Sequence, residues 1–357
     1  MNSSYVPAYD GLRFLLLLGV LEFHYCIHAV PIQQIWFLSY CLPCFFVLSG
    51  FLITQVLVRA GGSWWEILKE FYLRRALRIF PAYYVVLVCA FLVYRIPYLE
   101  WHLTYLFNLK LFAGSLAPPT PDVLAFMSHW DTNGLHLWSM GVEEQFYVLF
   151  PPLLLLTSER WRTAWLITGI LISIALRLWL SQAFPASSYG ALLPVAGEYI
   201  LWGCLFAWLD HRAQPQWMRK PALLLISLAG LVVLFLCESG LERYSLGQMA
   251  PPPQQTLYAA CLAGFIVALK YQGATGLARW MGWKPLAQLG KISYGTYLVH
   301  PFLNPLVDRI LSGFPGLIIW PAAPRAVLGP ALSLVVAGLM WVTFEHRVNR
   351  IKRRPVE

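Results

Sequence analysis

The stretch GLRFLLLLGVLEFHYC, residues 11–26, decides the fold class of this chain. It is mostly apolar, yet it carries Arg13, Glu22 and His24. The apolar segment around it, residues 12–30, is long enough to cross a bilayer, which takes about 20 residues. Ionisable groups inside such a segment are costly in lipid and are therefore candidates for function. No basic segment precedes it and no cleavage site follows it, so we expect a retained membrane helix rather than a signal peptide.

The whole chain shares this apolar character. Its 357 residues are 59% hydrophobic and 12% charged, whereas soluble domains have about 25% charged residues. Mean hydropathy is +0.60, and the 16 Trp and 18 Tyr suit a protein with two membrane interfaces. The net charge of +9 would also fit a nucleic-acid binder. The basic residues, however, fall in short gaps between apolar segments, so we expect a lipid bilayer as partner and no nucleic acid.

The apolar segments predict the fold class, an all-α integral membrane bundle of about ten transmembrane helices. We take residues 1–357 as a single transmembrane domain. The stretch 99–113 is apolar but short, which is typical of an interfacial or re-entrant segment. The expected spans are 12–30, 35–58, 79–96, 143–157, 163–182, 190–209, 221–237, 255–271, 287–311 and 326–344.

The distribution of Lys and Arg predicts the orientation. If the N-terminus is cytoplasmic, the cytoplasmic connections hold 18 of the 26 Lys and Arg, and both termini are cytoplasmic. We therefore expect a multi-pass protein of the cytoplasmic (inner) membrane. These basic residues are Arg59, Lys69, Arg74, Arg75, Arg78, Arg160, Arg162, Arg212, Arg219, Lys220, Lys270, Arg279, Lys284, Arg347, Arg350, Lys352, Arg353 and Arg354.

The first helix carries the leading candidates for chemistry. Arg13 and His24 are eleven residues apart, close to three helical turns, so they share a face and lie about 16 Å apart along the axis. Arg13 would sit at the cytoplasmic edge and His24 in the membrane interior, either as a functional group or as a contact between helices. His28 lies one turn beyond His24, but no third ligand is evident, and we expect no metal. Glu22 projects roughly opposite His24.

A basic pair stands at the start of the third expected span. Arg75 and Arg78 are one turn apart in the segment FYLRRALRIFP, residues 71–81, and face the same way. Such a pair can grip a phosphate. It can equally be a topology signal that touches lipid headgroups. The residues alone leave both interpretations open.

Two later segments also place polar side chains in apolar surroundings. Glu143, in the segment LWSMGVEEQFY at 137–147, lies at the start of a span, where the helix dipole favours a carboxylate without any catalytic duty. Trp138 there would suit a membrane interface equally well. Ser293, Tyr297 and His300 follow i, i+4, i+7 spacing, and this stripe could line a polar cavity or bond between helices.

Together, these motifs resemble the acyltransferase 3 family of membrane O-acyltransferases. Any single motif is weak, but their order and spacing run from residue 9 to residue 345. The matching stretches are YDGLR at 9–13 with His24, FFVLSGFLIT at 45–54, YLRRALRIFP at 72–81, WS at 138–139, EEQFY at 143–147, SYGTYLVH at 293–300 and Glu345.

The resemblance implies a ten-helix enzyme, an acyltransferase of class EC 2.3.1.-, that takes an acyl group from cytoplasmic acyl-CoA. Acetyl-CoA is the expected donor, and no metal is expected. The acceptor would be a hydroxyl of a cell-envelope glycan or a lipid-linked sugar. By this resemblance Arg13, Arg75 and Arg78 bind the donor, and His24 is catalytic. We assign Glu143 a catalytic role as well, in orienting His24 or contacting the acceptor.

Substrate binding completes the expected site. We assign it to Trp138, Ser139, Tyr297 and His300. Some relatives carry an extra extracytoplasmic hydrolase-like (SGNH) domain, and the 357 residues contain no counterpart of it. We therefore expect transfer to be completed in the membrane domain or by a partner.

Several alternatives stay open at this point. A polytopic transporter or flippase for a glycan or lipid-linked sugar would also need ionisable residues inside the membrane. It would not consume acyl-CoA, however, and would leave the spacing of Arg13 and His24 without a purpose. A structural membrane subunit would explain the topology but not the buried histidine. The acceptor is equally open among O-antigen, exopolysaccharide, peptidoglycan, a lipid-linked sugar and a secondary metabolite such as a macrolide.

Overall fold

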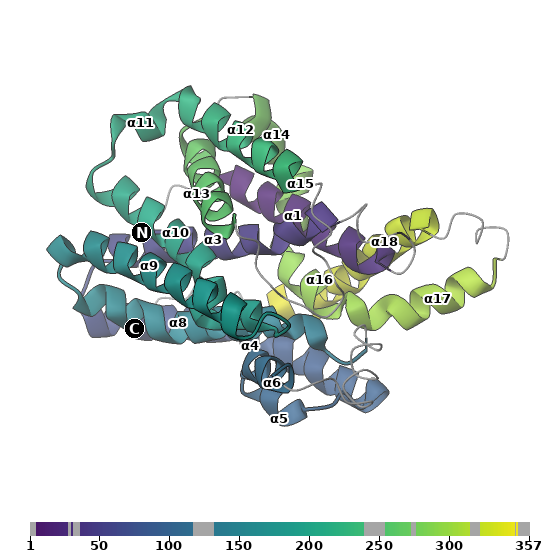
Figure 1. The fold of residues 1–357 in the computed structure, drawn as a ribbon. Coiled ribbons are helices and arrows are strands. Elements are labelled where there is room, and N and C mark those ends of the chain that lie inside the picture. The colour runs from purple at the N-terminus through teal and green to yellow at the C-terminus, as the bar shows by residue number, and fades with distance from the viewer. Residues whose placement is uncertain are drawn as a thin grey trace.

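A computed structural model describes residues 5–27, 30, 36–116, 132–238, 254–272, 276–314, 322–346 and 348. These residues form helices and their connections, and no β-strand occurs among them. The expected all-α class is therefore confirmed for the described part of the chain. Figure 1 shows long helices packed side by side, with the short helices α5 and α6 gathered at one end of α4.

The helices have the following bounds. The longer ones are α1 (Pro7–Cys26), α3 (Cys41–Arg59), α4 (Trp64–Tyr94), α8 (Trp138–Leu156), α9 (Glu159–Ala183), α10 (Leu193–Arg212), α12 (Pro221–Glu238), α13 (Gln255–Tyr271) and α18 (Ala322–Met340). The shorter ones are η1 (Trp36–Tyr40), α5 (Leu99–Leu103), α6 (Phe107–Gly114), η2 (Leu135–Leu137), η3 (Tyr189–Ala191), α11 (Gln216–Arg219), α14 (Gly276–Met281), α15 (Lys284–Lys291), α16 (Ser293–Val299), η4 (Pro301–Leu303), α17 (Asn304–Ser312) and the π-helical turn η6 (Trp341–Glu345).

Four helical stretches among the described residues are long and apolar enough to cross a membrane. They are Phe37–Arg59, Trp64–Tyr94, Glu159–Ala183 and Ala323–Glu345. Pro221–Cys237 and Gln255–Tyr271 are apolar but shorter. The first helix is not in this group, although it is continuous, because Asp10, Arg13 and Glu22 interrupt its apolar sequence. The number of ten spans and the side of the termini stay predictions.

Helix α4 begins much earlier than the expected third span, which started at residue 79. It runs unbroken for 31 residues, so the segment before residue 79 is helical as well. Ser63 and Glu66 form a capping box, in which each side chain bonds the backbone N–H of the other, and this fixes the early start. Arg75 and Arg78 therefore project from a rigid helix rather than from a loop.

The ninth expected span, 287–311, is broken into α15, α16, η4 and α17. Pro301 explains the break after α16, because proline has no backbone N–H and cannot continue the hydrogen-bond ladder of α16. Side chains also bond carbonyls at this break: the Tyr25 hydroxyl donates to His300 O at 2.7 Å and the Tyr94 hydroxyl to Phe302 O at 2.6 Å. Such side-chain partners are what permits a helix break in apolar surroundings.

The centre of the molecule is a tight pair formed by α3 and α10. Gly50 and Gly203 let the two backbones touch. A Cβ atom at Gly203 would lie 2.0 Å from the Val47 carbonyl oxygen, and one at Gly50 would lie 2.0 Å from that of Ile200. Small residues of this kind are how helices approach closely in membranes.

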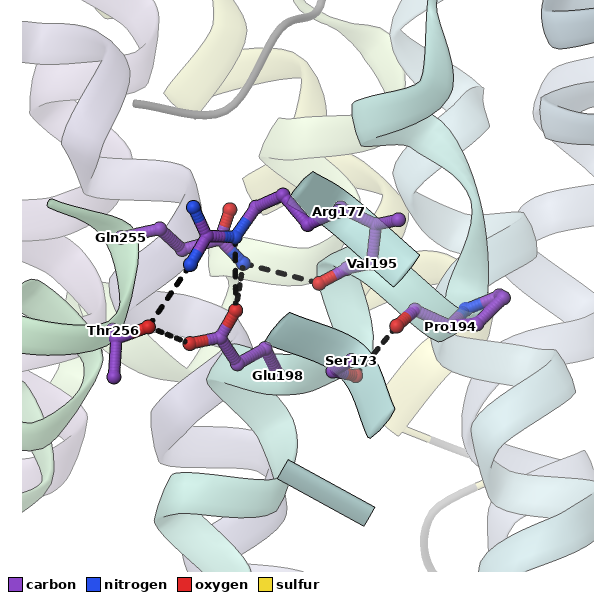
Figure 2. A network of polar contacts seen from close by, with 7 residues as sticks. All are labelled: Ser173, Arg177, Pro194, Val195, Glu198, Gln255 and Thr256. Atoms are coloured by element: carbon purple, nitrogen blue, oxygen red, sulfur yellow. Dashed lines mark hydrogen bonds and ion pairs between the residues drawn. The ribbon is translucent and has the colours of Figure 1, made fainter. Parts of the chain in front are cut away.

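A buried network of an ion pair and hydrogen bonds connects α9, α10 and α13 (Figure 2). Arg177 Nε lies 3.2 Å from Glu198 Oε2, and both side chains are almost wholly inaccessible to solvent. Thr256 and Gln255 donate to the same carboxylate at 2.5 and 3.1 Å, and Arg177 also donates to Thr256 at 3.0 Å. A buried ion pair is tolerated only with such additional hydrogen bonds. We interpret this network as structural.

Candidate active site

Helix α1 carries Arg13 and His24 on one unbroken helix, as expected. Arg13 is held by Asp10, one turn away, whose Oδ1 lies 2.5 Å from the guanidinium. Tyr5 donates to the other carboxylate oxygen of Asp10 at 2.9 Å. His24 lies in the last turn of α1, so the two candidates occupy opposite ends of this helix.

Arg75 and Arg78 line a pocket of about 220 Å³ between α3 and α4. Val56, Leu57 and Phe71 contribute apolar walls to it. Arg13 and Arg75 are each close enough for their charges to act on Arg78. Because like charges repel, guanidinium groups gathered in this way indicate a site for an anion.

Three contacts connect the residues beside this arginine site. The Arg75 guanidinium stacks over the ring of Tyr147 at 4.5 Å. The Tyr147 hydroxyl donates to Glu143 Oε2 at 2.5 Å, and Ser49 donates to Glu143 Oε1 at 3.3 Å. Glu143 is thus joined to α3 and to its own helix beside the arginines. The structure shows no direct role for it in catalysis, and that assignment stays a prediction.

His24 meets His300 across the interface of α1 and α16. His24 Nδ1 lies 2.7 Å from His300 Nε2, and the two rings stack with centroids 4.9 Å apart. His300 is fully buried. Its other nitrogen, Nδ1, lies 2.6 Å from the Tyr297 carbonyl oxygen. Both nitrogens of His300 are therefore engaged within the protein.

The other predicted substrate-binding residues surround His136. The Tyr297 hydroxyl donates to the His136 carbonyl at 2.8 Å and lies 2.6 Å from Ser139 Oγ. The ring of His136 lies 5.3 Å from that of His300. Trp138 packs edge-on against Phe46 at 6.2 Å and is half-buried. Ser139, Tyr297 and His300 therefore come together, as the sequence spacing indicated, whereas Trp138 faces apolar neighbours.

A row of polar side chains lies between the two ends of the site. Ser139, Glu143 and Tyr147 are spaced by four residues on α8, so they share one face of that helix. This row, which we call the polar seam, starts at Arg75 and ends at His24. It runs through Tyr147, Glu143, Ser139, Tyr297 and His300.

The sequence did not single out several partners that the structure reveals. Asp10, Ser49, Tyr147, Tyr25 and His136 all contact predicted site residues. Asp10 had a local signal, its i, i+3 spacing from Arg13, and Tyr147 stands at i+4 from Glu143. The others come from distant parts of the chain, and no spacing could have paired them.

Metal binding gains no support from the described residues. No three His, Cys, Asp or Glu side chains among them are grouped to hold a metal ion. His28, whose spacing from His24 raised the question, lies outside the described residues. The expectation that no metal is used stays a prediction.

Comparison with known proteins places this arrangement in a family. The profile of the acyltransferase domain known as acyltransferase 3 matches residues 6–342. The chain belongs to the acyltransferase 3 family. No solved structure matches the chain significantly.

Curated relatives of the chain are named as O-acetyltransferases. The chain is 28% identical to peptidoglycan O-acetyltransferase OatA of Listeria monocytogenes over 385 aligned positions, which cover 98% of this chain and 56% of the relative. It is 25% identical to O-acetyltransferase OatA of Staphylococcus aureus over 330 positions, 84% of this chain and 50% of the relative. The chain thus spans about half the length of the curated relatives it matches.

Proposed function

We propose that this acyltransferase 3 family member is a membrane O-acyltransferase that transfers an acetyl group from cytoplasmic acetyl-CoA to a hydroxyl of a cell-envelope glycan. The observation that carries the proposal is the polar seam, which runs from an arginine site to the pair formed by the half-buried His24 and the buried His300. The named relatives, which are O-acetyltransferases, support the choice of acetyl over longer acyl groups.

The donor would enter at the arginine site. Arg13, Arg75 and Arg78 would bind the phosphates of acetyl-CoA, since guanidinium groups form strong charge-assisted bonds with phosphate. The apolar wall of the pocket suits the rest of the nucleotide. The pantetheine arm would then follow α1, whose length from Arg13 to His24 is about 16 Å. This places the thioester beside His24.

The chemistry then needs one base. In the reaction, the lone pair of His24 takes the proton of the acceptor hydroxyl as its oxygen attacks the thioester carbonyl. The C–S bond breaks, and His24 returns the proton to the leaving thiolate of CoA. In the alternative order, His24 Nε2 attacks the thioester carbonyl, the C–S bond breaks and CoA leaves as the thiolate. The acceptor hydroxyl then attacks the acyl-imidazole, the C–N bond breaks, and the hydroxyl proton goes to the CoA thiolate. Both sequences balance in atoms and protons.

The acceptor would come from the opposite side of the membrane. The bias of Lys and Arg puts both termini and the arginine site on the cytoplasmic side, and His24 lies at the other end of α1. Tyr297, Ser139 and the half-buried Trp138 surround this end and could bind a sugar. The relatives named for peptidoglycan favour a cell-wall glycan over a secondary metabolite.

Mass spectrometry of envelope glycans from cells with and without the gene tests the reaction. We expect acetylated glycan fragments with the wild-type gene and none with His24→Ala, because the base or carrier is missing. Immunoblots of membrane fractions should show equal amounts of both proteins. Wild-type acetylation by His24→Ala, or unchanged glycans with and without the gene, would contradict the proposal. Glycan export without acetylation would favour the transporter.

Binding of coenzyme A to purified protein in nanodiscs tests the donor site. We expect Arg75→Gln and Arg78→Gln each to raise the Kd by about 10- to 100-fold, since a hydrogen bond to a charged group contributes about 1.5–3 kcal/mol. Lys69→Gln is the matched control, because Lys69 is exposed on the same helix. Equal effects of all three substitutions would indicate a general surface charge rather than a site.

A further inference from the structure

Pro301 leaves one carbonyl of α16 without its usual partner. In a continuous helix, the Tyr297 carbonyl would accept the N–H of residue 301, but proline has none. His300 Nδ1 takes that place, 2.6 Å from the oxygen. Because a carbonyl oxygen accepts and cannot donate, Nδ1 of His300 must carry a proton.

His300 is neutral in its surroundings. Its ring is fully buried, and the ionisable groups found to act on it are His24 and His136, neither of which is acidic. A buried charge without a counterion costs several kcal/mol at least. A neutral imidazole with its proton on Nδ1 has a lone pair on Nε2.

The lone pair on Nε2 of His300 determines which nitrogen of His24 carries the proton. His300 Nε2 lies 2.7 Å from His24 Nδ1 and can only accept, so His24 Nδ1 must donate. A neutral His24 protonated on Nδ1 has its lone pair on Nε2. We propose that His300 is a positioning residue that fixes this tautomer of His24 and makes Nε2 the nitrogen that reacts. The proposal rests on the function proposed above, in which His24 is the base or acyl carrier.

Other contacts hold His300 in this orientation. The Tyr25 hydroxyl donates to the His300 carbonyl at 2.7 Å and lies 2.7 Å from Ser333 Oγ on α18. The backbone N–H of His300 donates to Thr296 at 3.1 Å. His300 is thus fixed at its backbone and at both ring nitrogens. In many protein sites, a second hydrogen-bond partner fixes the tautomer of a functional histidine.

The consequence for the reaction is that Nδ1 of His24 stays bonded throughout. When His24 acts as the base, the hydroxyl proton arrives at Nε2 and leaves from Nε2 for the CoA thiolate. When His24 carries the acetyl group, Nε2 is the nitrogen that is acylated. In both orders the ring never has to exchange tautomers. This role differs from the expected one, which is substrate binding. Both ring nitrogens of His300 are bonded within the protein, one to His24 and one to the Tyr297 carbonyl, so neither is available to a substrate.

A matched pair of variants tests the acceptor function of His300. His300→Gln keeps an acceptor oxygen near the Nε2 position, whereas His300→Met has a similar length and no acceptor. With radiolabelled acetyl-CoA and isolated cell envelopes as acceptor, we expect His300→Met to lower kcat about 100-fold, within the range for a misplaced general base. His300→Gln should recover at least tenfold of this loss. The KM for acetyl-CoA should stay within about twofold in both.

Nitrogen-15 NMR of the wild-type protein labelled at histidine tests the tautomer directly and does not depend on how the His300 variants fold. The signals of His24 are assigned from the spectrum of His24→Gln. We expect a protonated, pyrrole-type signal for Nδ1 and an unprotonated, pyridine-type signal for Nε2. The reverse assignment would overturn the proposal.

The outcomes separate this proposal from the function on which it rests. If the wild type transfers acetyl, His24→Ala does not, and His300→Met matches the wild type, the role of His300 is wrong and the proposed function stands. Equal losses in His300→Met and His300→Gln would also overturn it, because they indicate packing alone. If the wild type transfers no acetyl group, the proposed function itself fails.

Discussion

Single residues in this protein act through few and specific contacts. Arg75 illustrates this, because its guanidinium sits over the face of Tyr147 while the hydroxyl of the same ring bonds Glu143. Tyr147 thus contacts a cation through its ring and a carboxylate through its hydroxyl. Substitution can separate these two interactions.

Tyr147→Phe and Tyr147→Leu form the test of this division. Tyr147→Phe keeps the aromatic face, so we expect the Kd for coenzyme A to change less than twofold. Tyr147→Leu removes the face and should raise the Kd by about two- to fivefold, since a cation–π contact contributes about 0.5–1 kcal/mol at partly exposed sites. The measurement is binding of coenzyme A in nanodiscs. An equal rise in both variants would show that the hydroxyl and Glu143 matter instead.

At the scale of elements, close helix contacts and helix breaks set the geometry. The contact of α3 with α10 depends on backbone touching backbone at Gly50 and Gly203. The break between α16 and α17 depends on Pro301. Each feature gives a prediction with an internal control.

Gly203→Ala should destabilise the protein although alanine is the better helix former. Its Cβ would lie 2.0 Å from the Val47 carbonyl oxygen, so α3 must shift, at a cost of about 1–3 kcal/mol or more. Gly338→Ala on α18 is the control, because a Cβ there meets no atom within 4 Å. Thermal unfolding in detergent, followed by size-exclusion chromatography, should show a lower midpoint for Gly203→Ala alone. Equal midpoints would contradict the tight contact.

Pro301→Ala should disturb catalysis without weakening donor binding. Alanine supplies a backbone N–H that can bond the Tyr297 carbonyl and compete with His300 Nδ1. We expect kcat to fall about three- to tenfold, a loss of roughly 1 kcal/mol comparable to one net hydrogen bond, with an unchanged KM for acetyl-CoA. Pro305→Ala, at the start of α17, is the control. The idea fails if both substitutions lower kcat equally.

The sequence predicts single elements better than their partners. The periodicity around Arg13 and His24 predicts the helix and the shared face, and the structure confirms that both lie on α1. The spacing of Ser293, Tyr297 and His300 likewise indicates their stripe. The pairing of His24 with His300, 276 positions away, could not be predicted, because periodicity describes one helix and says nothing of which helix it meets.

Two element boundaries depend on local features that hydropathy does not show. The expected third span begins at residue 79, because hydropathy weighs the charges of residues 66–78 against a membrane span, but the helix itself begins at Trp64. The capping box at Ser63 and the good helix propensity of Glu, Lys and Arg explain this early start. The expected ninth span ignored Pro301 because its neighbours are apolar.

At the scale of the whole molecule, the bundle is held partly by charge buried away from the site. The network of Arg177 and Glu198 lies on α9 and α10, and α13 contributes Thr256 and Gln255 (Figure 2). It joins three helices, and its residues take no part in the polar seam. Its loss should therefore affect assembly of the bundle rather than the chemistry.

Arg177→Met should lower the stability of the protein strongly. It leaves Glu198 buried without its cation, which costs about 3–5 kcal/mol. The double variant Arg177→Met with Glu198→Met removes both charges and should recover part of the loss. Thermal midpoints in detergent measure this, and wild-type stability of Arg177→Met would contradict it. Acetyl transfer by the surviving folded fraction should have an unchanged KM.

The unbroken helix α1 also fixes the angle between the side chains at its two ends. One residue inserted between Arg13 and His24 would lengthen it by only about 1.5 Å but turn everything beyond by about 100°. His24 would then point away from His300, although Arg13 kept its place beside Asp10. The number of residues between Arg13 and His24, more than their apolar identity, therefore keeps both side chains on the same face of the helix.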